Sequence, residues 1–183
     1  VVRDPNGTTI ARNNFSSVDT AVNIGSKSND TKSGTVSVEN NEFSDITQFG
    51  AVLVNNPDDS LDVDIEDNTI RSSEIGIFTF TSSADATFSI QDNEFKEFDT
   101  DQVFVDDTAG VLNLSDILNN NNNNFNSDND PGVVTIENSS GNLVEGLFSG
   151  VQEAVNAASS GNTIDVDDGT YDEDVTITTG SLI

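Results

Sequence analysis

Apolar and polar residues alternate in short runs along most of the chain, which is the pattern of half-buried β-strands. The clearest runs cover residues 36–38, 51–54, 61–65 and 87–90. Asp, Asn, Ser and Pro fill the gaps between the runs, and these residues favour turns. The pattern therefore predicts an all-β protein made of many short strands.

An asparagine followed two places later by an apolar residue recurs along the chain. The asparagines are Asn13, Asn41, Asn68, Asn93 and Asn123, at intervals of 28, 27, 25 and 30 residues. The apolar partners are Phe15, Phe43, Ile70, Phe95 and Phe125. A period of this size is typical of repeat architectures, in which each unit buries its apolar face by stacking on its neighbours.

These repeats favour a right-handed parallel β-helix, a solenoid with coils of about 25–30 residues. We expect the five asparagines to stack in register at the turns, where they also tolerate a left-handed backbone. The phenylalanines of the repeat are expected to stack in the core. The alternative fold is a sandwich or a meander in which the Asn-x-Phe pairs recur by coincidence.

The carboxy-terminal part has a different pattern. Val151, Ala154, Val155 and Ala158 lie on one face of a predicted short helix. The sequence Gly-Asn-Thr-Ile follows at 161–164, and Gly-Thr-Tyr at 169–171 ends on Tyr171. This series resembles the opening cap of the pectin-lyase-like right-handed parallel β-helix superfamily across residues 151–177, with Asn162 where that family usually has Asp. The upstream coils resemble the same superfamily more weakly.

The resemblance implies two parts. Residues 1–145 would form the β-helix coils, and residues 146–183 would supply a cap helix and the first strands of a following β-helix, with Tyr171 packed beneath the cap helix. An opening cap belongs before the coils, whereas here it follows them. We therefore expect head-to-tail joining, either within a tandem polypeptide or between subunits. A head-to-tail contact that does not close gives a filament. The alternative is a chain cut at an arbitrary point.

The charge is extreme: 33 acids oppose 6 bases, giving a net charge of −27. Such a surface repels itself at low ionic strength, but molar salt shortens the screening length to about 3 Å. The composition resembles that of surface proteins from haloarchaea or their viruses; an ordinary acidic secreted protein is the alternative. Nucleic acid is not expected as a partner, because phosphate binding needs clustered bases. No apolar stretch is long enough to predict a membrane span.

The chain contains no histidine and no cysteine. Adjacent acids such as Asp58 and Asp59 are expected by chance in so acidic a chain, so the sequence predicts no catalytic residues and no enzyme. One loop places side-chain oxygens at alternate positions, which suggests a weak calcium site at Asn126, Asp128 and Asp130. The alternative is an acidic loop with loosely bound sodium or potassium. No other cofactor is expected.

Five Asn-x-Ser/Thr sequons mark candidate glycosylation sites. They begin at Asn6, Asn14, Asn29, Asn113 and Asn138. We expect at least one of them to carry a glycan, given the extracellular, cell-surface or virion-surface location that the composition favours.

The sequence favours a structural role: a subunit of an extracellular, halophilic surface filament or fibre, assembled head to tail through its ends as a homo-oligomer or tandem repeat. The alternative is a carbohydrate-binding or adhesive module, such as a viral spike or tail fibre. A polysaccharide lyase or hydrolase is a weaker alternative, since the acidic-polysaccharide enzymes of the resembled fold use Arg, Lys or His.

Overall fold

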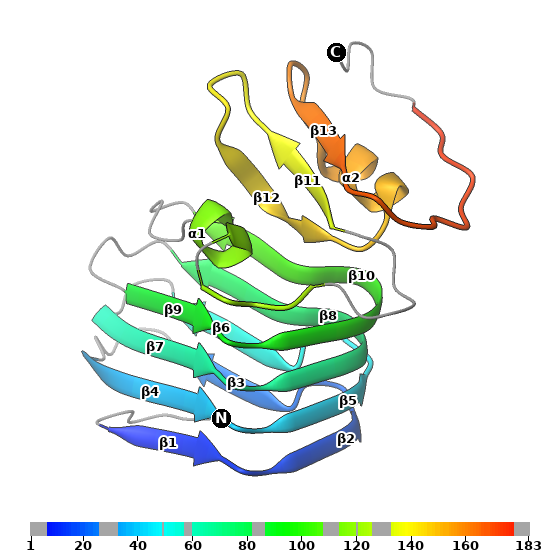
Figure 1. Cartoon of the computed structure of the whole chain (residues 1–183). Coiled ribbons are helices and arrows are strands. Elements are labelled where there is room, and N and C mark those ends of the chain that lie inside the picture. Colours follow the sequence, from blue (N-terminus) through cyan, green and yellow to red (C-terminus); the bar gives the residue numbers. More distant parts are fainter. Residues whose placement is uncertain are drawn as a thin grey trace.

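The structure is a computed structural model of the chain, and it describes residues 7–25, 33–48, 50–56, 60–81, 87–107, 114–119, 121–125 and 133–177. Thirteen strands and two helices make up the described part (Figure 1). The strands are β1 (Thr8–Ala11), β2 (Asn14–Val18), β3 (Val22–Gly25), β4 (Ser33–Glu39), β5 (Glu42–Ile46), β6 (Val52–Asn56), β7 (Ser60–Glu66), β8 (Thr69–Thr81), β9 (Thr87–Gln91), β10 (Glu94–Asp107), β11 (Val134–Glu137), β12 (Leu143–Phe148) and β13 (Thr163–Val166). The helices are α1 (Leu114–Asn119) and α2 (Val151–Ala157).

The smaller sheet contains four parallel strands in the order β1-β4-β7-β9. Its register follows the repeat, because Ile10 pairs with Val38, Val38 with Ile65, and Ile65 with Ile90. Apolar residues that alternate along each strand therefore align across the strands. They form continuous columns on the inner face of the sheet.

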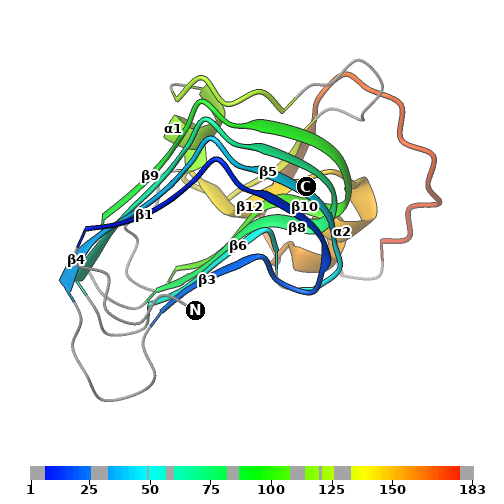
Figure 2. The ribbon, with the colours of Figure 1, turned by 90° about the horizontal axis from the view of Figure 1, so that it is seen from below.

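The larger sheet contains nine strands and is mixed. Strands β2, β5, β8 and β10 are parallel neighbours, and β3 and β6 continue the parallel pairing beside the second half of β8. From β10 onward the pairing becomes antiparallel, through β12, β11 and β13. Seen from below, the ribbon bends between the small sheet and the strand labelled β5, then curves round and returns as β3 and β6, which run opposite the small sheet (Figure 2).

The predicted right-handed parallel β-helix is wrong. The strands form one sheet of four parallel strands and a second, mixed sheet, not a closed solenoid. The antiparallel part arises at the turn after β11, where Gly141 adopts a φ of 77° and donates its N–H to the carbonyl of Asn138. This hairpin returns the chain beside β11, whereas a solenoid coil would carry it forward.

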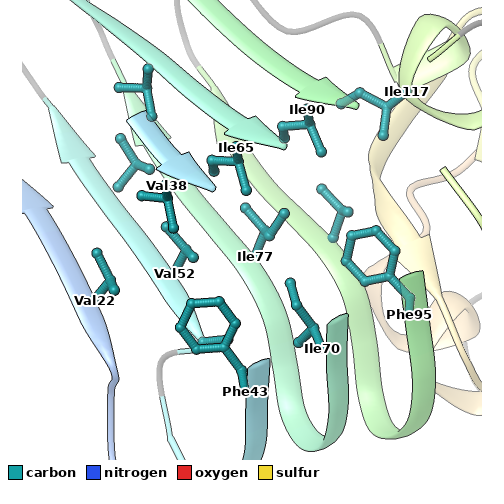
Figure 3. Packing of buried hydrophobic residues seen from close by; sticks show 14 of the residues in the cluster. Val22, Val38, Phe43, Val52, Ile65, Ile70, Ile77, Ile90, Phe95 and Ile117 are labelled. Carbon is teal, nitrogen blue, oxygen red and sulfur yellow. The ribbon is translucent and has the colours of Figure 1, made fainter. Parts of the chain in front are cut away.

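The core consists of two apolar clusters. The first runs between the two sheets, and Figure 3 shows its members in rows from successive strands, such as Phe43, Ile70 and Phe95. The second lies beneath α2 and contains Val134, Ile136, Phe148, Ala154 and Ala158. Strand β12 runs through residue 145, the predicted boundary between the two parts of the chain. Its Leu147 packs in the first cluster and Phe148 packs in the second.

Helix α2 coincides with the short helix that the sequence predicts near the carboxy terminus. Helix α1 was not predicted; its Leu114 and Ile117 are buried and join the first cluster next to the last parallel strands. Together with Phe125 and Leu147, α1 covers the upper end of the parallel stack, the end that carries β9 and β10 in Figure 1.

Candidate functional site

The structure places the five repeat asparagines in one hydrogen-bonded ladder. From Asn41 onward, the side-chain Oδ1 of each asparagine accepts the backbone N–H of the preceding one, at 2.9 Å for Asn13 to Asn41, 2.9 Å for Asn41 to Asn68, 3.1 Å for Asn68 to Asn93 and 3.0 Å for Asn93 to Asn123. The same Oδ1 atoms also accept the side-chain Nδ2 of the preceding asparagine. The ladder therefore links five successive rungs of the stack.

Each ladder position follows a residue with a left-handed backbone. These residues are Arg12, Asn40, Asp67, Asp92 and Asn122, with φ between 52° and 58°. The ladder asparagines themselves are not among the left-handed residues, so the left-handed corner lies one residue earlier than the sequence analysis expected. The two neighbouring positions have different roles. The first residue turns the chain, and the asparagine after it points its amide inward to bind the freed backbone groups.

The ladder is closed at its upper end and open at its lower end. Asn41, Asn68 and Asn93 are buried, whereas Asn13 is exposed. At the upper end, Asn123 Nδ2 donates to the carbonyls of Ile90 and Ile117, so α1 takes part in closing the ladder. At the lower end, no donor among the described residues reaches Asn13 Oδ1.

The lower end is also an open sheet edge. Strands β1, β2 and β3 each pair on one side only within the described part of the chain. The apolar side chains of Ile10 and Phe15 are half-buried there, and Val18 is exposed. An unpaired edge presents backbone N–H and C=O groups that can pair with another strand.

The apolar residues after the asparagines stack in a column beside the ladder. The rings of Phe15 and Phe43 lie 5.1 Å apart with an interplanar angle of 6°. Those of Phe95 and Phe125 lie 4.7 Å apart at 13°. Ile70 pairs with Phe43 on one side and Phe95 on the other, so it sits between the two aromatic pairs.

A third aromatic pair lies on the outer face of the large sheet and was missed from the sequence. Phe78 and Phe104 are paired across β8 and β10, with ring centroids 5.0 Å apart. Both are half-buried, whereas their neighbours Ile77 and Val103 are fully buried. The alternation of Ile-Phe and Val-Phe marks two faces of each strand. It contains no signal for which face is covered.

Four of the five predicted cap residues belong to the second cluster or pack against it, and Val155 is buried outside both clusters. Ala154 and Val155 are buried on α2 and Ala158 is buried at its C-cap, while Val151 and Tyr171 are half-buried beside the second cluster. The Tyr171 hydroxyl donates to the carbonyl of Asp167 at 3.1 Å. Burial raises the pKa of Tyr171, and the charges of Asp167, Glu173 and Asp168 add to that rise.

Residues 173–177 are fixed to the start of α2 by two side chains. The Glu173 carboxylate accepts the backbone N–H of Val151 at 2.6 Å and that of Gln152 at 2.9 Å. The Gln152 amide accepts the backbone N–H of Thr176 at 2.6 Å and donates to the carbonyl of Thr176 at 3.3 Å. A carboxylate and an amide therefore hold this segment along one of its edges.

A row of acids lies on the outer face of the small sheet. Asp62, Asp64 and Glu66 alternate along β7, and Thr87 and Gln91 of β9 donate to Asp62 and Glu66. Partial burial raises the pKa of Asp64, and the neighbouring charges of Glu66 and Asp62 raise it further. Within the described ranges, no group of three or more His, Cys, Asp or Glu side chains could hold a metal ion.

The predicted calcium ligands Asn126, Asp128 and Asp130 lie outside the described residues, as do the sequon residues Asn6, Asn29 and Asn113. The other two sequons are placed. Asn14 is exposed on β2, where its Nδ2 donates to Glu42. Asn138 begins the hairpin turn, and its Oδ1 accepts the backbone N–H groups of Ser140 and Asn142.

Comparisons with protein-family models, with curated proteins and with solved structures found no match for this chain. Among the described helices, none has the length and apolar character needed to cross a membrane.

Proposed function

We propose that the chain is a structural subunit of an extracellular surface filament or fibre that works at high salt and assembles head to tail through the ends of its strand stack. One observation carries the proposal: the parallel stack has unlike ends. Its upper end is covered by α1, whereas its lower end exposes the unpaired edges of β1, β2 and β3 and the Oδ1 of Asn13. Unlike ends suit a heterologous contact, which repeats along an axis.

The charge supports the high-salt part of the proposal. A net charge of −27 opposes contact between copies in dilute buffer. At about 1 M salt, the screening length of about 3 Å is shorter than the distance between most surface charges. Backbone pairing and apolar contacts at the ends can then outweigh the repulsion, so assembly is expected only in concentrated salt.

Electron microscopy and light scattering of the purified full chain test this function. In about 3 M KCl we expect threads with a regular axial repeat, and in about 0.1 M KCl we expect separate molecules. Particles that stay monomeric in both solutions, across micromolar to millimolar protein, would sink the filament proposal.

A carbohydrate-binding or adhesive module is the second candidate. The stacked pair Phe78 and Phe104 on the outer face favours it, because flat aromatic faces pack against apolar sugar faces. An open polar hollow at the β1–β2 corner, lined in part by Arg12, Asn14 and Glu42, adds hydrogen-bonding groups. Retention on a glycan array that is lost in Phe104→Ala, with no threads in molar salt, would favour this candidate over the filament.

A further inference from the structure

Two features at opposite parts of the chain complement each other. Across the small sheet, the inward residues form two columns, Thr8-Val36-Val63-Phe88 and Ile10-Val38-Ile65-Ile90. In the middle of the sheet, Val36, Val38, Val63 and Ile65 have no exposed surface. At the lower edge, Thr8 and Ile10 remain half-buried because nothing in the described part lies beneath them. Both columns therefore end at residues that have no described neighbour beneath them.

Residues 174–177 have the sequence that would extend those columns. Val175-Thr176-Ile177 repeats the apolar-polar-apolar pattern of Val36-Ser37-Val38 and Val63-Asp64-Ile65. Unlike those residues, Val175 is 43% exposed and Ile177 is 60% exposed. In Figure 1 the segment runs outside the sheets, in red. Within the described part of its own chain, this strand-like segment therefore pairs with no other strand.

The free edge of this segment is available for pairing. Successive residues of an extended strand direct their backbone groups to opposite edges. The Gln152 amide binds both the N–H and the carbonyl of Thr176. If the segment is extended, the backbone groups of Val175 and Ile177 face the other edge. No described residue hydrogen-bonds to them. Gln152 therefore fixes the segment and leaves its second edge unpaired.

We propose that residues 174–177 of one copy add to the β1 edge of a second copy as a fifth strand of its small sheet, parallel to β1. Val175 would lie on Thr8 and Ile177 on Ile10, which continues both inward columns. The inference rests on the proposed head-to-tail assembly and names the contact that makes it. The second copy is the occupant favoured by the sequence, because the segment repeats the pattern of the strands already stacked in that sheet.

Exposed apolar residues support a contact between these two regions. The described part of the chain exposes four large apolar side chains: Val18, Val166, Val175 and Ile177. Two of them, Val175 and Ile177, belong to the segment; Val18 lies on β2, outside the proposed contact with β1. Strand addition of this kind gains main-chain hydrogen bonds from the edge and specificity from alternate side chains.

Disulfide trapping tests the register directly, because the chain contains no cysteine. In the proposed register Thr176 lies beside Thr9 at the spacing of neighbouring strands, about 5 Å, which suits a disulfide. In about 3 M KCl with an added oxidant, the variant Thr9→Cys/Thr176→Cys should form a series of covalent multimers. Each single variant should remain monomeric on a non-reducing gel.

Two outcomes of the trapping would overturn the inference. Dimers of Thr9→Cys alone would mean that β1 edges pair with each other. Multimers of the control Thr9→Cys/Ser89→Cys would mean that the β1 edge meets the β9 end of the next copy, since Ser89 lies in the same outward column as Thr9.

A second pair of variants weakens the apolar contact while keeping both positions β-branched. Val175→Thr/Ile177→Thr should raise the protein concentration needed for assembly about tenfold, because two buried apolar groups are lost. The control Val166→Thr removes an exposed valine elsewhere and should leave that concentration unchanged. If the double variant assembles like the unaltered chain, this contact is wrong while the filament proposal stands. If the unaltered chain does not assemble, both fail.

Discussion

The side chain of Asn68 satisfies three backbone groups at once. Its Oδ1 accepts the backbone N–H of Asn41, and its Nδ2 lies 2.8 Å from the carbonyl of Val38 and 2.9 Å from that of Glu66. The side chain is 1% exposed, so water cannot replace these partners. A buried polar group left without a partner costs about 1–3 kcal/mol. The middle of the ladder therefore depends on the amide itself.

Asn68→Leu should lower the free energy of unfolding by about 3 kcal/mol or more, because leucine keeps the volume but leaves several buried groups unpaired. Chemical unfolding followed by circular dichroism in concentrated KCl measures the loss. Asn13→Leu is the matched control: Asn13 is exposed and its Oδ1 accepts nothing among the described residues, so its loss should be smaller. Equal losses at the two positions would contradict a ladder held mainly by its buried rungs.

Asp64 allows a test of the acidic face. Because its pKa in the folded protein is raised above 3.8, the folded state binds the proton more tightly than the unfolded chain. Ionised Asp64 thus opposes folding: stability rises as the pH falls through the folded pKa and is lost as the pH rises through it. Asp64→Asn should raise the melting temperature at pH 7 and low salt. The control Asp172→Asn removes an acid away from the sheet, and an equal gain there would contradict a local effect.

At the residue scale, the repeat in the sequence located the ladder and its aromatic column, because both recur at the same interval. It misplaced the left-handed corner by one residue, since turn residues such as Asp and Asn occupy both positions. It did not mark Phe78 and Phe104 as an outward pair. Period-two alternation separates the two faces of a strand, but burial of a face depends on what the rest of the chain places over it.

At the element scale, α2 is a short helix that depends on a distant residue. It has only seven residues, and its Gly150 N-cap supplies no side-chain hydrogen bond. Glu173 instead binds the first backbone N–H groups with both carboxylate oxygens. Its negative charge also lies at the positive end of the helix dipole. The cap therefore links α2 to the segment that carries Val175 and Ile177.

Glu173→Gln should destabilise this region by about 1 kcal/mol, because the amide keeps one acceptor oxygen and loses the charge. Hydrogen exchange of the Val151 and Gln152 amides should accelerate, while the amides of β4 and β7 remain protected. Asp174→Asn removes a neighbouring charge that makes no described bond to α2, and it should change neither. Unaltered exchange at Val151 in Glu173→Gln would show that the carboxylate does not hold the helix.

Besides α1, the sequence did not predict how the strands pair after the last ladder asparagine. Upstream, the regular interval favoured parallel pairing in register, and the paired strands follow that interval. Downstream, the resemblance suggested that residues 163–166 would start a new coil. The structure instead pairs β13 antiparallel with β11. The turn beginning at Asn138 supplies the reversal, but a polar turn with glycine fits both a coil corner and a hairpin, so local sequence alone does not separate them.

At the scale of the whole molecule, acidic side chains greatly outnumber basic ones on the surface. Within the described ranges, Arg71 pairs with Glu42 and Lys96 with Glu94, while no acid pairs with the exposed Arg12. With 33 acids and 6 bases in the chain, ion pairs can neutralise only a minority of the acids. Most of the surface charge must be screened by dissolved ions rather than by neighbouring side chains.

The stability of the monomer should therefore rise steeply with salt. Raising KCl from about 0.1 M to about 1 M shortens the screening length from about 10 Å to about 3 Å, so we expect the melting temperature to rise by on the order of 10 °C. Scanning calorimetry of Val175→Thr/Ile177→Thr at low protein concentration separates this effect from assembly. NaCl should act like KCl if screening is responsible, whereas a response to KCl alone would indicate specific potassium sites. A melting temperature that does not change with either salt would mean that repulsion between the acids costs the folded state little free energy. The charges would then already be far enough apart in water.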